Sequence, residues 1–160
     1  MNKLIINTDG GSRGNPGPAA IGIVIKNDQG EFIFEHGEKI GVATNNQAEH
    51  KAALFAMEWL INYSLLKNYD TVEFRLDSQL VAYQLTGKYK IKNKELLEIL
   101  VKTKAGEAKL DTRVVYCYVP REENKEADRI LNLALDTSWP FIIFFAKKVD
   151  QHNVWYDYTG

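Results

Sequence analysis

The chain has 160 residues, of which 45% are hydrophobic and 26% are charged. This length suits one domain around a single core, and the composition excludes a disordered, collagen-like or coiled-coil protein. The formal net charge is −1, so binding to nucleic acid would need a local basic patch rather than a basic molecule.

The N-terminal part has the pattern of three short β-strands that are separated by glycine-bearing turns. We expect strands at residues 4–8, 20–26 and 31–39. Their short connections favour an antiparallel meander. Asp9 directly follows the first apolar run, and the glycine-rich stretch after it is typical of a turn. We therefore expect Asp9 to close the first strand.

The apolar period changes from that of strands to that of helices at about residue 45. The patterns predict a long helix at 45–63, a strand at 71–76, helices at 78–85 and 93–105, a strand at 112–119 and a last helix at 122–135. This order of elements predicts an α/β sandwich with a mixed sheet.

We expect one domain at residues 1–136 and a C-terminal extension at residues 137–160 that packs on it. The extension contains the apolar run Phe141–Ala146, which is far too short to cross a bilayer. Three roles for this run remain open, because it could pack on the domain, add an edge strand or form a dimer contact.

Four carboxylates stand either at the end of a predicted strand or on the apolar face of a predicted helix. Asp9 and Asp77 end predicted strands, whereas Glu49 and Asp128 share helical stripes with apolar residues. Burying a carboxylate without a partner is costly, so we expect a cation or raised pKa values with shared protons. Oxygen-only ligands suit Mg²⁺ or Mn²⁺, and carboxylates that hold two such ions about 4 Å apart recur in phosphodiester hydrolysis.

Each carboxylate taken alone also has a structural explanation. Glu49 could be a favourable charge near a helix N-terminus. Asp77 precedes Ser78, a pattern typical of a helix N-cap. Asp9 could belong to a turn, and Asp128 could be one more solvated charge.

Four strings carry a resemblance to a known family: TDGGSRGNPG, TNNQAE, RLDSQLV and REENKEAD, in this order. Together they resemble the type 1 ribonuclease H family over residues 1 to about 136. The resemblance implies a ribonuclease H-like fold with a five-stranded mixed sheet and helices on both faces. It also implies cleavage of the RNA strand of RNA–DNA hybrids with two divalent ions, Mg²⁺ or Mn²⁺, leaving 5′-phosphate and 3′-hydroxyl ends. By this resemblance Asp9, Glu49, Asp77 and Asp128 are the metal-binding catalytic residues.

Two polar stretches are candidates for contacts with the substrate. Glycines after Asp9 would let the backbone approach a substrate. Amides before Glu49 suit base edges and ribose hydroxyls in the minor groove of a hybrid, although Thr44 or Asn45 could simply cap the helix. The candidates are Gly10, Gly11, Ser12, Asn15, Thr44, Asn45, Asn46 and Gln47.

A basic segment alternates lysines with Tyr89 and Ile91. In an extended conformation the lysines would share one side, where four phosphate contacts would weaken binding roughly a hundredfold between 50 and 200 mM salt. A solvated loop is the alternative reading. The four lysines are Lys88, Lys90, Lys92 and Lys94.

Many relatives carry a histidine in the loop before the last helix, whereas residues 118–124 of this chain contain none. Arg121 is the nearest candidate for a catalytic contribution, through contact with a phosphate rather than proton transfer, because arginine stays protonated. Its alternative is a surface ion pair with Glu122 or Glu126.

We therefore expect a metal-dependent endoribonuclease that acts on RNA–DNA hybrids. Two alternatives are a catalytically silent hybrid-binding module and a nuclease of the same fold that acts on another duplex. A single cysteine, Cys117, and the lack of a signal-peptide pattern favour a cytoplasmic protein without membrane contacts. We expect a monomer, with a dimer through the C-terminal extension as the alternative.

Overall fold

The computed structural model describes residues 2–137 and 143–146 of the chain. The strands are β1 (Lys3–Ser12), β2 (Gly17–Asn27), β3 (Phe32–Ala43), β4 (Thr71–Leu76), β5 (Arg113–Tyr118) and β6 (Ile143–Ala146). The helices are α1 (Asn45–Ile61), α2 (Gln79–Leu85), α3 (Lys94–Ala108) and α4 (Lys125–Asp136), with short 3₁₀ helices η1 (Leu66–Asn68) and η2 (Arg121–Glu123). No helix in the described ranges has the length and apolar character that spanning a membrane requires.

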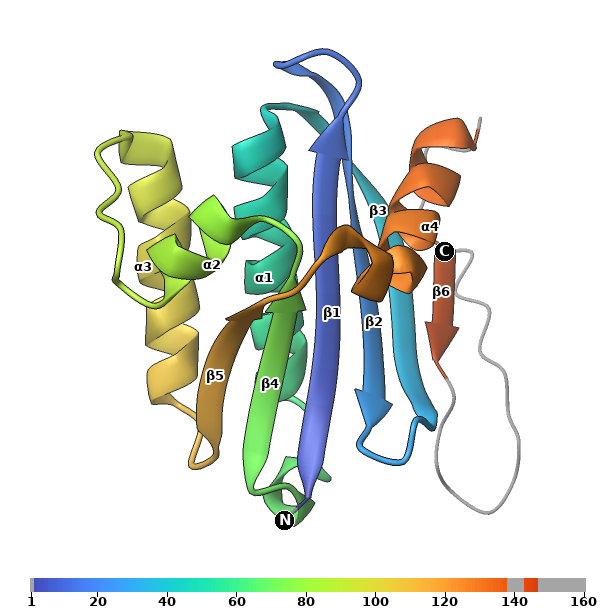
Figure 1. Cartoon of the computed structure of the whole chain (residues 1–160), viewed down its shortest axis with the longest axis vertical. Helices are drawn as coiled ribbons and strands as arrows, with labels where there is room; N and C mark the ends of the chain where they lie inside the picture. The colour runs from blue at the N-terminus through green and yellow to red at the C-terminus, as the bar shows by residue number, and fades with distance from the viewer. Residues whose placement is uncertain (1, 138–142, 147–160) are drawn as a thin grey trace.

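The strands form one mixed sheet in the order β5-β4-β1-β2-β3-β6 (Figure 1). β1, β2 and β3 form the expected antiparallel meander, whereas β4 and β5 run parallel to β1. Five of these strands are the mixed sheet that the sequence predicts. The sixth, β6, pairs antiparallel with the edge of β3, which is one of the three roles left open for the apolar run. Residues 138–142 and 147–160 lie outside the described residues, and the domain boundary at residue 136 stays a prediction.

Helices cover both faces of the sheet, as predicted (Figure 1). In β2, Ile21, Ile23 and Ile25 lie in the main core, together with the apolar side of α1. Val24 points the other way and packs on α4. Gly22 lies on this second face, where a Cβ atom would be 2.3 Å from the Ala127 carbonyl oxygen. The missing side chain therefore lets α4 lie directly on the strand.

β1 is longer than the sequence predicts, and the expectation that Asp9 closes it is wrong. Asp9 lies inside β1 opposite Gly22, and the pairing continues to Ser12 opposite Ala19. The glycines do not break the strand because β2 continues alongside them. Gly10 instead accommodates the helix behind the sheet, since a Cβ there would be 2.2 Å from the Ala48 carbonyl carbon in α1. The irregular turn is confined to residues 13–16.

The last helix begins later than predicted. Residues 121–123 form the 3₁₀ helix η2, and α4 begins at Lys125. Asn124 separates the two, and its side chain makes no helix-capping hydrogen bond. Its amide is used elsewhere, as described below.

Candidate active site

Asp9 and Asp77 come from neighbouring parallel strands and lie at the same level of the sheet. β1 pairs with β4 so that Asn7 lies opposite Arg75, and each carboxylate follows its strand residue by two positions. Asp77 directly follows the last residue of β4. Ligand sites in α/β sheets lie characteristically at the carboxyl ends of parallel strands, where these two side chains meet.

The start of α1 positions Glu49. Thr44 is the N-cap, and its Oγ1 accepts a hydrogen bond from the backbone N of Gln47 at 3.1 Å. Oε1 of Gln47 in turn accepts one from the backbone N of Thr44 at 2.9 Å. This capping box fixes where the helix begins. Glu49 follows just over one turn into the helix and is 9% exposed.

Asp128 reaches the same place from the first turn of α4. Its negative charge and its hydrogen bonding to Asp9 both raise the pKa of Asp9. Asn132, one turn further along the helix, donates from Nδ2 to Oδ1 of Asp128 at 3.2 Å. Three separate layers of the fold therefore supply the four carboxylates: the sheet, α1 and α4.

Carboxylate oxygens of Asp9, Glu49 and Asp77 all lie within 4.8 Å of one another. Asp128 lies outside this triad but lines the same open cleft of about 540 Å³. The cleft is lined by Asp9, Gly10, Gly11, Ser12, Arg13, Asn45, Glu49, Asp77, Ser78, Arg121, Asp128, Leu131, Asn132 and Leu135. The structure thus brings together the four carboxylates that the sequence singled out.

Crowding of these carboxylates in a buried place disfavours their charged forms. Burial raises the pKa of Asp9 to about 8, with further contributions from the negative charges of Asp77 and Asp128. Burial and the charges of Asp9 and Asp77 raise the pKa of Glu49 well above its ordinary value. The pKa of Asp77 is also raised by burial, although Arg121 and a hydrogen bond from Asn124 oppose the shift.

The donor set fits a hard divalent cation. Oε2 of Glu49 is buried and has no hydrogen-bond partner among the described residues. A buried acceptor without a partner is costly, and here it stands beside the carboxylates of Asp9 and Asp77. Mg²⁺, Mn²⁺ and Ca²⁺ prefer such oxygen-only surroundings.

Arg121 lines the cleft from η2, beside Asp77. Its positive charge opposes the rise in the pKa of Asp77. Glu126, one of the surface partners considered for it, pairs with Lys26 at 2.6 Å. The geometry therefore favours the cleft position over a surface ion pair.

The candidate polar residues of the β1–β2 hairpin are tied to the start of α1. Oδ1 of Asn45 accepts hydrogen bonds from the backbone N of Ser12 at 2.9 Å and from its hydroxyl at 3.2 Å. Oδ1 of Asn15 accepts one from the backbone N of Asn45 at 3.0 Å. Ser12 and Asn45 line the cleft, as do Gly10 and Gly11. Asn15 is not among the described residues that line the cleft, and it connects the hairpin to α1 through its hydrogen bond with Asn45.

The other polar residues at the start of α1 have mainly structural partners. Thr44 and Gln47 form the capping box, and Nε2 of Gln47 also donates to Glu95 of α3. Oδ1 of Asn46 is buried and has no hydrogen-bond partner within the described part of the chain. Thr44 therefore accounts for the predicted helix cap.

The comparisons with known proteins bear on the family and the fold of the chain. The sequence profile of a family described as "Reverse transcriptase-like" matches residues 7–134. Ribonuclease HI of Halobacterium salinarum is 41% identical over 128 residues, which are 80% of this chain and 62% of that protein. Ribonuclease H of Chromohalobacter salexigens is 30% identical over 145 residues, which are 85% of this chain and 86% of that protein.

A solved structure matches over nearly its whole length. The crystal structure of LC11-RNase H1 in complex with an RNA/DNA hybrid has a TM-score of 0.78 and 41% identity, and the match covers 83% of this chain and 96% of that one. The chain belongs to the type 1 ribonuclease H family. It spans 62% of the Halobacterium relative and 36% of the mycobacterial proteins among its first matches.

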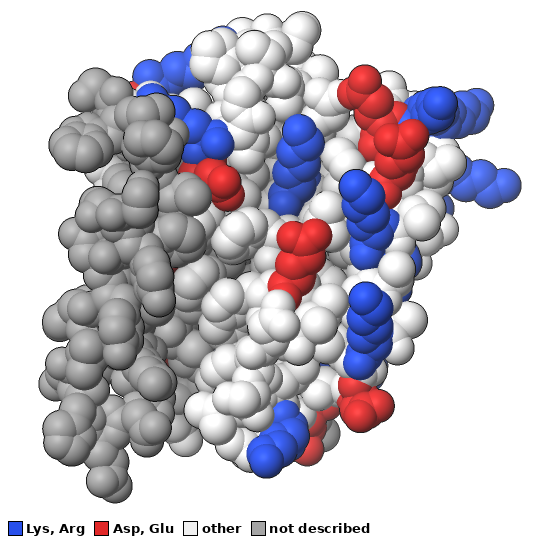
Figure 2. Space-filling model, turned by 180° about the vertical axis from the view of Figure 1, so that it is seen from behind, with Lys and Arg blue, Asp and Glu red and all other residues white. Residues whose placement is uncertain are grey.

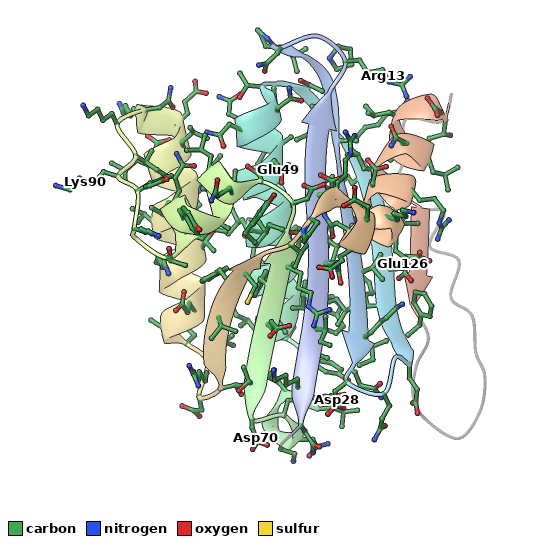
Figure 3. All side chains as sticks on the ribbon, viewed as in Figure 1. Arg13, Asp28, Glu49, Asp70, Lys90 and Glu126 are labelled. Carbon is green, nitrogen blue, oxygen red and sulfur yellow. The ribbon has the colours of Figure 1, made fainter. Side chains whose placement is uncertain are left out.

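The basic segment lies on the loop between α2 and α3. Lys88, Lys90 and Lys92 are exposed in this loop, and Lys94 is the first residue of α3. None of the four is among the described residues that line the cleft. Lys90 points away from the domain (Figure 3). The lysines do not simply share one side of the segment with the aromatic residues on the other. Lys88 stacks 4.3 Å above the ring of Tyr83, which also contacts Tyr89.

Sequence reasoning missed Asn124, which connects three parts of the site. Its Nδ2 donates to the backbone O of Thr8 at 3.0 Å, and its Oδ1 accepts from Nδ2 of Asn7 at 2.9 Å. It also donates to Asp77, and it is 1% exposed. Its place in the sequence resembles an ordinary N-cap, so no local pattern indicates these contacts.

Three further polar residues of the cleft were not predicted as site residues: Arg13, Ser78 and Asn132. Ser78 caps α2 through a hydrogen bond from the backbone N of Val81 at 3.3 Å. Asn132 fixes the carboxylate of Asp128. The only signal available for Asn132 was its spacing of one helical turn from Asp128.

Proposed function

We propose that this protein is an endoribonuclease that hydrolyses the RNA strand of RNA–DNA hybrids and leaves 5′-phosphate and 3′-hydroxyl ends. The observation that carries the proposal is the triad of Asp9, Glu49 and Asp77, whose carboxylate oxygens lie within 4.8 Å of one another in an open cleft. Family membership supports it, as does the hybrid bound to the similar LC11-RNase H1.

Asp9, Glu49, Asp77 and Asp128 would hold two divalent cations, Mg²⁺ or Mn²⁺. When bound, such ions lower the pKa of an attacking water and stabilise charge on the leaving oxygen of a phosphodiester. The residues themselves supply the negative charge and the fixed positions. The orphaned Oε2 of Glu49 and the raised pKa of Asp9 support this role, because a cation would relieve both.

Arg121 would contact the phosphate that is cleaved or one next to it. A guanidinium forms paired hydrogen bonds with phosphate oxygens and stays charged at every physiological pH. Its place in the cleft beside Asp77 supports this role. It would balance part of the charge that four carboxylates and a polyanion bring together.

Recognition of the hybrid would come from Asn45 and Asn46. Asn45 lines the cleft, and its amide orientation is fixed by Ser12. An amide at this place can meet the 2′-hydroxyls that line the wide minor groove of an A-like duplex. Gln47 already uses both polar atoms of its amide within the protein, so we limit the proposal to the two asparagines.

The test compares labelled RNA–DNA, RNA–RNA and DNA–DNA duplexes with Mg²⁺, Mn²⁺ or EDTA. We expect cleavage of the RNA strand of the hybrid alone, and none with EDTA. Asp77→Asn should bind the hybrid without cleaving it. Binding without cleavage in every metal would favour a silent hybrid-binding module, and faster cleavage of another duplex would favour a different nuclease.

We also infer a cytoplasmic monomer. The single Cys117 supports a reducing compartment. Gel filtration of the full chain and of a chain that ends at residue 137 would test whether the extension forms a dimer contact.

A further inference from the structure

Arg13 lies at the tip of the β1–β2 hairpin and reaches across to the end of α4. Its Nη2 donates a hydrogen bond to Oδ1 of Asp136, the last residue of that helix. Figure 3 shows the arginine directed from the hairpin toward α4. The side chains are 54% and 59% exposed, so the pair lies in solvent.

The same arginine lines the carboxylate cleft. Among the described lining residues the basic ones are Arg13 and Arg121, and they come from different elements. Arg121 stands beside Asp77, whereas Arg13 stands on the hairpin that also carries Gly11 and Ser12. A nucleic acid strand laid along this cleft would meet both cations.

The partner of Arg13 is easily replaced. Exposed ion pairs contribute little to stability, because water screens the charges and both side chains lose freedom. Asp136 also stands at the C-terminal end of α4, where the helix dipole disfavours a negative charge. A phosphodiester offers two oxygens in the geometry that a guanidinium binds best.

We propose that Arg13 binds a backbone phosphate of the substrate duplex and that Asp136 competes for Arg13 in the free protein. The proposal rests on the proposed function, since it names a contact of the same cleft. Asp136 lowers the affinity for the duplex only through Arg13. Removal of the carboxylate therefore strengthens binding, and removal of the arginine weakens it.

The experiment measures binding of a fluorescent RNA–DNA hybrid to the full chain in EDTA, where no cleavage occurs, at several salt concentrations. Arg13→Ala is expected to weaken binding about threefold to tenfold and to reduce the slope of log affinity against log salt by about one, as for one lost phosphate contact. Asp136→Asn is expected to tighten binding about twofold to fivefold, because it releases a pre-positioned arginine. In the double variant the Asp136 substitution is expected to have no further effect.

The ion pair between Arg129 and Glu35 is the matched control. It also joins α4 to the sheet, at 2.8 Å, and its arginine is 61% exposed. Neither residue is among those described as lining the cleft. Arg129→Ala changes the net charge as Arg13→Ala does, and Glu35→Gln changes it as Asp136→Asn does. Both controls should leave the slope of log affinity against log salt near that of the parent.

Two outcomes would overturn the inference. One is an affinity and salt slope for Arg13→Ala equal to those of the Arg129→Ala control. The other is tighter binding by Asp136→Asn in the absence of Arg13, which would show a general effect of charge. Thermal melting of each variant verifies its fold. A parent chain that neither binds nor cleaves the hybrid would instead refute the proposed function.

Discussion

The surroundings of Asp9 favour its protonated form. The pKa of this residue is raised to about 8, chiefly because the side chain is buried and secondly because Asp77 and Asp128 are negative. At neutral pH the cation-free site therefore holds hydrogen ions, which divalent cations must displace. Apparent metal affinity should accordingly rise with pH.

The same proton makes the stability of the cation-free protein depend on pH. The pKa of Asp9 is about 8 in the folded protein and about 4 in the unfolded chain. Asp9 therefore contributes its full stabilisation of the folded state below about pH 4, and this stabilisation is lost as the pH rises through about 8. We expect the melting temperature in EDTA to fall between pH 5 and pH 8. Asp9→Asn should flatten this fall and abolish cleavage. Asp28→Asn, at an exposed site, is the control, and an equal slope in all three proteins would contradict the prediction.

Asn124 is a positioning residue whose loss should be felt in both stability and activity. Asn124→Ala removes the hydrogen bond to the buried carbonyl of Thr8, and it leaves the amide of Asn7 with only its 3.3 Å bond to the backbone O of Glu123. The expected cost is about 1–3 kcal/mol of unfolding free energy, measured by denaturant titration. Cleavage should fall as well, because Asp77 loses a hydrogen bond.

Asn62→Ala is the control for this substitution. Asn62 is exposed at the end of α1, where its amide donates to the backbone O of Glu58 at 3.3 Å. Its replacement should change the unfolding free energy by less than about 0.5 kcal/mol. Equal effects of the two substitutions would assign Asn124 no special role.

At the scale of the elements, the distance between β1 and α1 decides whether Glu49 reaches Asp9. The helix approaches the strand at Gly10, where its own backbone at Ala48 and Glu49 occupies the space of a side chain. Any side chain at this position would push the helix away and carry Glu49 with it. The glycine thus serves the site through packing and not only through access for a substrate.

Gly10→Ala should therefore destabilise the protein and lower cleavage. The added Cβ would lie 2.2 Å from the Ala48 carbonyl carbon, a contact that backbone atoms cannot relieve without moving the helix. We expect a loss of at least about 1–3 kcal/mol in unfolding free energy. Gly11→Ala is the neighbouring control for stability, because its Cβ would meet Leu131 at an ordinary 3.4 Å. Similar losses for both would contradict this account.

Much of the fold could be read from periodicity, and much of the site from spacing. Near Asn45 the apolar residues change from every second position to helical spacing, and this change predicted α1 with an error of two residues at its C-terminal end. The four carboxylates converge as expected. The extent of β1 could not be predicted, because glycine is a turn former unless a partner strand lies beside it. The contacts of Asn124 and Arg13 could not be predicted either, since they join segments more than 100 residues apart.

At the scale of the molecule, the proposed substrate is a polyanion, whereas the chain has a net charge of −1 and an acidic cleft. On the face turned away from the viewer in Figure 1, basic and acidic side chains are mixed and not gathered by sign (Figure 2). Attraction to a duplex must come from limited groups of cations. Arg13 and Arg121 supply two in the cleft, and the α2–α3 loop holds a further group.

Substitution of the loop lysines by glutamine tests whether this group contacts the duplex. If all four meet phosphates, the slope of log affinity against log salt should fall by about 3 to 4, and the KM for the hybrid should rise while kcat changes little. All four are exposed and none is among the described residues that line the cleft, so we expect no purely catalytic effect. The control replaces the exposed Lys67 of η1, Lys102 in the later part of α3 and Lys109 at the end of that helix, and is compared per lysine. A loop variant with the slope of this control would make the segment a solvated loop. The substituted residues are Lys88, Lys90, Lys92 and Lys94.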